Sequence, residues 1–180
     1  MKGKAGIIMK MLNGRTAVVT GGGSGMGQQI ALLFAKEGAE VFILGRTKSK
    51  LEETVRLASR IGRSIKSVVC DVSNENEVFG FFRSLKMRGV TANVIVNCAG
   101  IINVKLPNGE LDNRAVMNVN FLGTMNICDC AIKHMIENKV PGSIINIASI
   151  AGHDGSSEFH SYAASKGAIL AYTKSIAMAY

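Results

Sequence analysis

Three polar side chains, Ser149, Tyr162 and Lys166, have the types and the spacing that could do proton chemistry. Tyr162 and Lys166 are four residues apart, so on a helix they share a face and the ammonium lies one turn from the phenol. A free phenol has a pKa of about 10, and a fixed cation beside it favours the ionised form. Together with the Ser149 hydroxyl, such a pair could donate a proton to a carbonyl oxygen. Because Tyr-x-x-x-Lys also arises by chance, the alternative is a helix with one aromatic residue and one solvated lysine.

A glycine-rich turn lies upstream of these residues. The apolar, β-branched run from Arg15 to Thr20 is typical of a buried strand, and residues 28–37 have the pattern of a helix. In this context glycines let the backbone approach a pyrophosphate, and the N–H groups that open the helix favour an anion. The spacing is T-G-x-x-x-G-x-G rather than G-x-G-x-x-G, and a glycine-rich connector without a ligand is the alternative. The residues predicted to contact a dinucleotide here are Thr20, Gly21, Ser24, Gly25, Met26 and Gly27.

Further motifs follow in order: Asp71-Val72 after the third predicted strand, Asn97-Cys-Ala-Gly100 after the fourth, then Asn120 and Ser149. With them the sequence resembles the compact type of short-chain dehydrogenase/reductase, from about Arg15 to the last residue. The resemblance implies that Asn97 steadies the central sheet and that Asp71 lies near the adenine, although both could be ordinary turn formers. It also implies that Asn120 holds a water that links Lys166 to solvent, whereas the alternative is a helix asparagine that satisfies backbone groups. The catalytic residues that the resemblance implies are Asn120, Ser149, Tyr162 and Lys166, and the further cofactor contacts are Asp71, Val72, Asn97, Ala99, Gly100, Tyr162 and Lys166.

The same resemblance implies a reaction, a hydride transfer between NADP(H) and a carbonyl or alcohol substrate. In it Ser149 donates a hydrogen bond to the substrate oxygen, and Tyr162 donates or accepts the proton. Lys166 stabilises the tyrosinate and hydrogen-bonds the nicotinamide ribose. An epimerase or dehydratase on the same fold is disfavoured by the glycine spacing and the length.

The choice of nucleotide depends on the residues that follow the second predicted strand. An acid at this position would bind the ribose 2′-hydroxyl of NAD, but the sequence has Gly45 and then Arg46. A guanidinium suits the 2′-phosphate of NADP, so NADP(H) is favoured. Ser24 is neutral and adds no second cation, so NAD(H) stays possible, and a solvated loop arginine is the alternative interpretation of Arg46.

The elements that must position these residues alternate between strand and helix. Near-continuous apolar strands predict an α/β fold, a Rossmann-like doubly wound parallel sheet with strand order 3-2-1-4-5. We expect an N-terminal extension over residues 1–14 and one dinucleotide-binding and catalytic domain over 15–180. The strands are predicted at 15–20, 40–44, 66–70, 93–97 and 143–148, and the helices at 25–37, 48–61, 74–87, 110–137 and 159–179.

Composition excludes several other classes of protein. The net charge of +8 could suggest nucleic acid, but the basic residues are dispersed and no aromatic residues alternate with them, so no nucleic-acid partner is expected. No stretch approaches 18 uninterrupted apolar residues, and the N-terminal stretch is a poor signal peptide, so no membrane association is expected. The cysteines form no C-x-x-C pair and no metal-ligand cluster, which predicts no metal and a reducing cytoplasm; they are Cys70, Cys98, Cys128 and Cys130.

The segment 153–160, between Ser149 and Tyr162, is expected to line the substrate pocket. It is polar and contains His153 and His160, which disfavours a purely lipidic substrate. His160 could contact the substrate, although a surface histidine is the alternative. The opposite wall is predicted from Ile101, Ile102 and Val104.

The sequence departs from the family at its end, Tyr180. Family members continue with two further strands, a helix pair and a Pro-Gly turn, so the chain is expected to be truncated and its fifth strand to present an unpaired edge. One hypothesis is an oxidoreductase of which these residues are the cofactor and catalytic portion, which would form homo-oligomers if complete. The other is a catalytically incompetent product that binds nucleotide or associates with full-length subunits.

Overall fold

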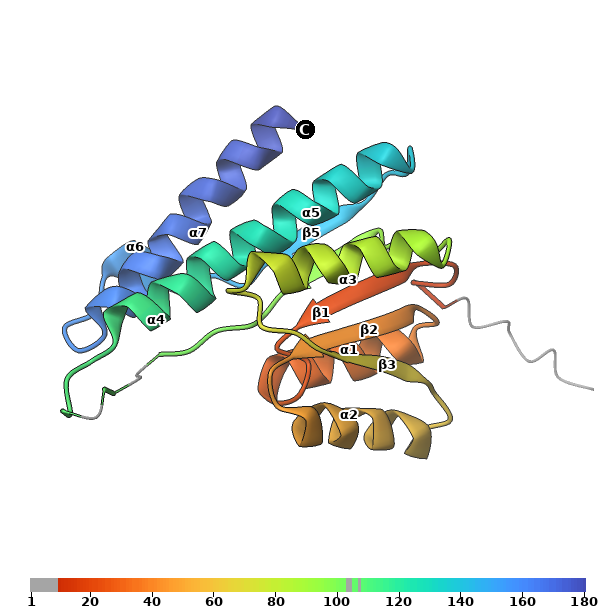
Figure 1. The fold of residues 1–180 in the computed structure, drawn as a ribbon, viewed down its shortest axis with the longest axis horizontal. Helices are drawn as coiled ribbons and strands as arrows, with labels where there is room; N and C mark the ends of the chain where they lie inside the picture. Colours follow the sequence, from red (N-terminus) through yellow and green to blue (C-terminus); the bar gives the residue numbers. More distant parts are fainter. Residues whose placement is uncertain (1–9, 103–104, 107) are drawn as a thin grey trace, which may run out of the picture.

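A five-stranded parallel sheet forms the centre of the computed structural model, which describes residues 10–102, 105–106 and 108–180 (Figure 1). Its strand order is β3-β2-β1-β4-β5, which confirms the predicted topology. Val19 in the central strand is level with Ile43 on one side and Val96 on the other. All carboxyl ends therefore meet at one edge of the sheet. The strands are β1 (Thr16–Thr20), β2 (Glu40–Gly45), β3 (Ile65–Val69), β4 (Val94–Asn97) and β5 (Ser143–Asn146).

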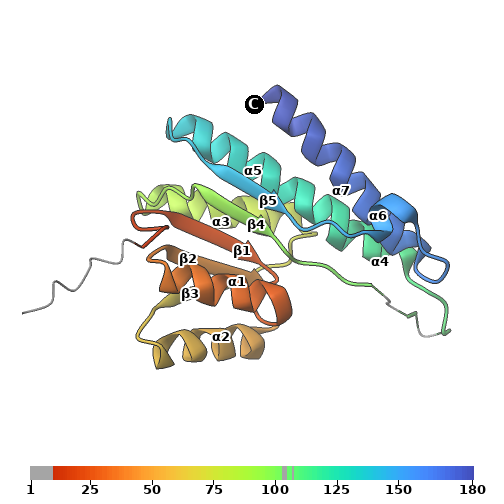
Figure 2. The same cartoon turned by 180° about the vertical axis from the view of Figure 1, so that it is seen from behind.

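Helices cover both faces of this sheet (Figure 2). On one face α1 (Gly25–Lys36) and α2 (Lys48–Arg60) bury small and aliphatic residues against β1 and β2. On the other face α3 (Glu75–Met87) and α5 (Gly123–Glu137) pack on β2 and β4 through a cluster that contains the edge-to-face pairs of Phe81 with Phe42 and Phe82. Burial on both faces explains why the central strands β1, β2 and β4 are mostly apolar, whereas the edge strands β3 and β5 contain polar residues and are more exposed.

The longest predicted helix, 110–137, differs from the structure in two ways. It begins at Asn113, because the Asp112 carboxylate accepts a hydrogen bond from the Ala115 N–H and caps α4 (Asn113–Met117). It then widens into a π-helical turn, η1 (Asn118–Leu122), before α5. A π turn inside a helix often marks a functional site, and this one contains Asn120.

The last part of the chain contains two helices, of which the sequence predicted one. The predicted helix 159–179 is α7 (His160–Ala179), which lies beside α5 in both views (Figures 1 and 2). The short helix α6 (Ala151–Asp154) was not predicted, and it packs against α7. β5 pairs with β4 alone among the described residues, and its Ile145 is 43% exposed, as expected of an edge strand. No helix within the described ranges is long and apolar enough to cross a membrane.

Part of the predicted N-terminal extension packs on the domain. Residues 1–9 lie outside the described residues. Beyond them the Leu12 N–H donates to the Glu37 carbonyl at 3.1 Å, and the Leu12 side chain packs against the core cluster under α1 and α2. The chain is thus attached to the domain before β1 begins.

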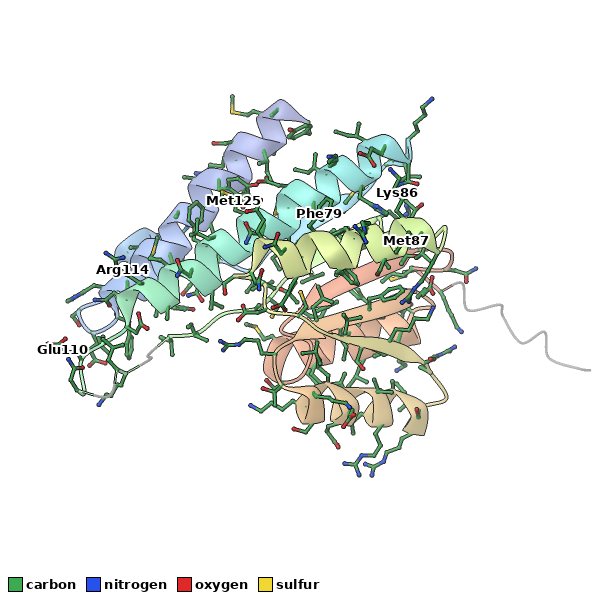
Figure 3. The ribbon with its side chains drawn as sticks, in the orientation of Figure 1. Phe79, Lys86, Met87, Glu110, Arg114 and Met125 are labelled. Atoms are coloured by element: carbon green, nitrogen blue, oxygen red, sulfur yellow. The ribbon has the colours of Figure 1, made fainter. Side chains whose placement is uncertain are left out.

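His134 is a buried histidine at the end of the sheet opposite the carboxyl ends of the strands. Its Nε2 accepts a hydrogen bond from the Ala92 N–H at 3.2 Å, and its ring lies 5.7 Å from that of Phe82. Burial lowers the pKa of His134, an effect that Glu137 opposes and Lys86 adds to. Lys86 on α3, labelled in Figure 3, forms an ion pair of 2.8 Å with Glu137 on α5, and both residues line a hollow with His134.

The lowered pKa of His134 predicts that the folded protein loses stability in mild acid. Because its folded pKa lies below the ordinary value of about 6.5, the unfolded chain takes up the proton first, and stability falls as the pH drops below that value. We expect the melting temperature to decline between pH 7.5 and 5.5 and the decline to flatten in His134→Gln. The exposed His160→Gln is the control, and an equal decline in both variants would contradict the assignment.

Candidate active site

The glycine turn between β1 and α1, residues 21–27, exposes backbone that few side chains cover, and we call it the glycine cradle. Gly21 and Gly25 adopt left-handed φ values of 66° and 52°, a conformation that favours glycine. A Cβ added to Gly27 would lie 2.4 Å from the Gly21 carbonyl oxygen, so only glycine allows α1 to approach the turn. Ser24 at the N-cap makes no side-chain capping bond, and the first turn of α1 has no acidic residue. This cradle and its helix N–H groups fit the pyrophosphate of a dinucleotide.

A cavity of about 220 Å³ opens beside the cradle, at the carboxyl ends of the strands. Ligands of open α/β sheets bind at this edge. Sequence reasoning missed Thr47 and Lys50, which line the cavity from the start of α2. The predicted cofactor contacts that line it are Gly21, Ser24, Arg46, Asp71, Val72, Ala99 and Gly100. The predicted contacts that lie outside its lining are Thr20, Gly25, Met26, Gly27, Asn97, Tyr162 and Lys166.

Thr20 and Asn97 are buried behind the cavity and join strand ends. The Thr20 hydroxyl oxygen accepts hydrogen bonds from the N–H groups of Cys98 and Ala99, each at 3.0 Å. The Asn97 amide nitrogen donates to Asn146 Oδ1 at 2.9 Å and so links β4 to β5. Asn97 Oδ1 is buried without a partner among the described residues. This geometry fits the sheet-steadying role that the resemblance implied for Asn97.

Arg46 and Asp71 meet at the rim of the cavity. The Arg46 guanidinium lies 4.0 Å from the Asp71 carboxylate, which parallel pairing of β2 with β3 brings to the same edge. Asp71 also accepts hydrogen bonds from the Ser73 N–H at 2.9 Å and the Ser73 hydroxyl at 2.7 Å. Asp71 therefore forms a turn, as the alternative interpretation had it, while its side chain also reaches the site.

The Tyr162 and Lys166 pair has the expected helical arrangement. Lys166 Nζ lies 5.6 Å from the centroid of the Tyr162 ring and donates a hydrogen bond to the Ile147 carbonyl at 2.6 Å. Lys166 is 5% exposed, and burial lowers the pKa of its ammonium, an effect that Cys98 opposes. Lys166 is therefore a fixed, nearly dry group over one face of the phenol ring.

Asn120 and Gly100 come together with this lysine. A Cβ added to Gly100 would lie 3.4 Å from Asn120 Oδ1 and 3.8 Å from Lys166 Nζ, so the Gly100 backbone lies next to both side chains. Asn120 is fully buried, and its Oδ1 accepts the Ile101 N–H at 2.8 Å. The water that the resemblance implies between Asn120 and Lys166 stays a prediction.

Ser149 stands between β5 and α6. Its Oγ accepts a hydrogen bond from the Ala151 N–H at 3.2 Å. A Cβ on Gly152 would lie 2.7 Å from the carbonyl carbon of Lys166, so the missing side chain lets α6 touch the backbone of α7. The unpredicted helix thus holds the segment after Ser149 against the helix that carries Tyr162 and Lys166.

The predicted walls of the substrate pocket are only partly visible. His153 and His160 are exposed, and the His160 ring bonds the Ser157 carbonyl at 3.1 Å. Ile101 lines the cavity at the strand ends and Ile102 is exposed, whereas Val104 lies outside the described residues. Groups of three or more histidine, cysteine or acidic residues that could hold a metal do not occur in the described part of the chain.

Comparisons with known proteins agree with this geometry. Residues 15–180 match the short chain dehydrogenase family. An uncharacterized oxidoreductase of Staphylococcus aureus is 34% identical over 170 residues, which are 93% of this chain and 72% of that protein. The structure of NAD+-bound xylitol dehydrogenase is similar with a TM-score of 0.85 and 31% identity, over 94% of this chain and 66% of that one.

A ketone-reducing enzyme is also among the similar structures. The F189W actinorhodin polyketide ketoreductase with NADPH has a TM-score of 0.82 and 30% identity, over 90% of this chain and 63% of that one. Both similar structures are longer than the region that they share with this chain. The match of nearly the whole sequence to one family, together with the cradle and the buried lysine, shows that the chain belongs to the short-chain dehydrogenases.

Proposed function

We propose that this chain is an oxidoreductase that transfers a hydride between NADP(H) and a carbonyl or alcohol substrate, with Tyr162 as proton donor and acceptor. The observation that carries the proposal is the position of Lys166. Its ammonium lies over the Tyr162 ring, 5.6 Å from the ring centroid. It would lie 3.8 Å from a Cβ added to Gly100, a residue that lines the cavity at the strand ends. A proton donor with its cation therefore adjoins the place where a dinucleotide fits.

The glycine cradle and the first turn of α1 would hold the pyrophosphate through backbone N–H groups. When bound, the nicotinamide supplies or accepts the hydride. Tyr162 Oη gives its proton to the substrate oxygen during reduction and takes it back during oxidation. Ser149 Oγ donates a hydrogen bond to the same oxygen, and Lys166 stabilises the negative charge left on Tyr162.

The preference for NADP(H) is supported by the start of α2. Thr47 stands at the N-cap without a side-chain capping bond, and the first turn of α2 has no acidic residue. Lys48 in this turn pairs with Glu52 at 3.7 Å, whereas Lys50 lines the cavity together with Arg46. The positive end of the helix dipole disfavours these two cations there unless an anion binds. A ribose 2′-phosphate at the cavity rim would satisfy these charges, and it would compete with Asp71 for Arg46.

Replacing Arg46 tests this preference. We expect Arg46→Ala to raise the dissociation constant for NADPH by about 10-fold or more, since a charge-assisted bond contributes roughly 1.5–3 kcal/mol, and to change that for NADH by less than about two-fold. Quenching or enhancement of the reduced nicotinamide fluorescence measures both constants. Arg60→Ala, at the far end of α2, is the matched control. Equal losses for both nucleotides would contradict binding of the 2′-phosphate.

A second candidate function is nucleotide binding combined with association with other subunits. It is favoured by the exposed edge of β5 and by an apolar hollow of about 690 Å³ between α5, β5 and the end of α7. Turnover of NADPH with a panel of carbonyl compounds supports the first function, whereas nucleotide binding without turnover in an assembled native species supports the second. Homo-oligomers are expected of the complete protein, and the free cysteines fit a cytoplasmic location.

A further inference from the structure

Ser165 is a buried polar residue that the proposed chemistry leaves unused. It lies on α7 between the two residues of the proton-donating pair and is 0% exposed. Its Oγ accepts a hydrogen bond from Asn120 Nδ2 at 3.0 Å and donates one to the Tyr162 carbonyl at 2.7 Å. A single hydroxyl therefore joins the π-helical turn η1 to the backbone of Tyr162.

The other side of Asn120 is attached to the wall of the cofactor cavity. Its Oδ1 accepts the Ile101 N–H at 2.8 Å, and its Nδ2 donates to the Ile101 carbonyl at 2.9 Å. With the bond to Ser165, both hydrogens of the Asn120 amide have acceptors. Ile101 lines the cavity. A continuous hydrogen-bonded path therefore runs from the cavity wall through Asn120 and Ser165 to Tyr162.

Near Tyr162, α7 is also held by the Lys166 hydrogen bond to the Ile147 carbonyl and by its packing against α6, and two further side-chain hydrogen bonds fix it farther along its length. Tyr172 donates a hydrogen bond to Asp129 on α5 at 2.7 Å, and Asn146 on β5 donates one to Thr173 at 2.9 Å. These residues are ten and eleven positions beyond Tyr162, roughly 15 Å along the helix at 1.5 Å per residue. At its start α7 has no side-chain cap. The turn that carries Tyr162 thus depends on nearby contacts for its position.

We propose that Ser165 is a positioning residue, which holds the first turn of α7, and with it the Tyr162 phenol, at a set place relative to the cofactor cavity. The inference rests on the proposed function, in which a phenol must meet a substrate oxygen and a bound nicotinamide at once. Removing the hydroxyl leaves one Asn120 N–H without its buried acceptor and frees the Tyr162 carbonyl from its second bond. Misplacement by an ångström is enough to slow a reaction that needs aligned groups.

The test compares three variants of the whole chain. Ser165→Ala removes the hydroxyl, Ser165→Thr keeps it, and Ser175→Ala removes an exposed hydroxyl that bonds only its own helix, at the Ala171 carbonyl. We expect Ser165→Ala to lower kcat per NADPH-binding site by about 10- to 100-fold, with KM for NADPH and carbonyl substrate within two-fold. Ser165→Thr should recover most of that loss, and Ser175→Ala should match the wild type. An unchanged kcat per site in Ser165→Ala, with only a lower melting temperature, would show a structural role and overturn the proposal.

A readout without turnover separates this inference from the proposed function. The chain has three tyrosines, so protein labelled with 3-fluorotyrosine gives three fluorine resonances, and the Tyr162→Phe variant identifies one of them. Ser165→Ala should shift the Tyr162 resonance and leave those of Tyr172 and Tyr180 in place. A wild-type chain without turnover contradicts the proposed function, and the fluorine spectra then decide the role of Ser165. If the Tyr162 resonance does not shift in Ser165→Ala, the proposed role of Ser165 is wrong.

Discussion

Tyr162→Phe should lower the rate of NADPH oxidation with a carbonyl substrate by about 10²- to 10⁴-fold, the range that general acid catalysis contributes. The substitution removes one oxygen and keeps the ring that Lys166 Nζ faces at 5.6 Å. Because the phenol lies outside the lining of the cavity at the strand ends, the dissociation constant for NADPH should change by less than about three-fold. Initial rates at 340 nm and nucleotide fluorescence measure the two quantities on one preparation.

Tyr180→Phe is the matched control for this experiment. Tyr180 is the C-cap of the helix that carries Tyr162, at the opposite end of that helix, and is 78% exposed. Its loss should leave the rate unchanged. If Tyr162→Phe turned over as fast as the wild type while both bound NADPH, the proton would have to come from another group, and the proposed role of Tyr162 would be wrong.

The sheet and most helices could be predicted because buried elements leave recognisable patterns of apolar residues in the sequence. Residues 41–44 are apolar without interruption, as two covered faces require, and the observed strand β2 is one residue longer than the predicted strand 40–44. The π turn could not be predicted, because a single widened turn barely changes the spacing of apolar residues along a helix. α6 is only four residues long and depends on the contact of Gly152 with α7, which is a tertiary contact without a local signal.

Part of the candidate site could likewise be predicted from the sequence, and part could not. Motif spacing predicted the residues that lie at turns, such as Gly27 and Arg46, since each turn has a local requirement for glycine or charge. The strand order could be predicted, but the side-chain contacts of these residues depend on register and on helix packing and could not be. Asp71 meets Arg46 only because β3 pairs with β2, and Ser165 meets Asn120 only because η1 packs on α7.

Gly27→Ala should nearly abolish nucleotide binding, with an expected rise in the dissociation constant for NADPH of about 100-fold or more. The added Cβ would lie 2.4 Å from the oxygen and 2.8 Å from the carbonyl carbon of Gly21, so backbone rather than a flexible side chain must move. The displaced Gly21 is itself in the left-handed region and lines the cavity, so the cradle cannot shift without changing the binding surface. We expect the melting temperature to fall as well, because the clash lies at the contact of α1 with β1.

Gly80→Ala separates this steric effect from the ordinary effect of alanine in a helix. Gly80 lies within α3, and a Cβ there would meet no atom within 4 Å, so the variant should gain about 0.5–1 kcal/mol of stability and bind NADPH as the wild type does. Opposite signs of the melting shift for the same chemical change would locate the requirement at the Gly21 carbonyl. Thermal unfolding with and without NADPH measures both effects, since a bound nucleotide raises the melting temperature of a competent cradle. A Gly27→Ala protein that NADPH stabilises as strongly as the wild type would show that the nucleotide binds elsewhere.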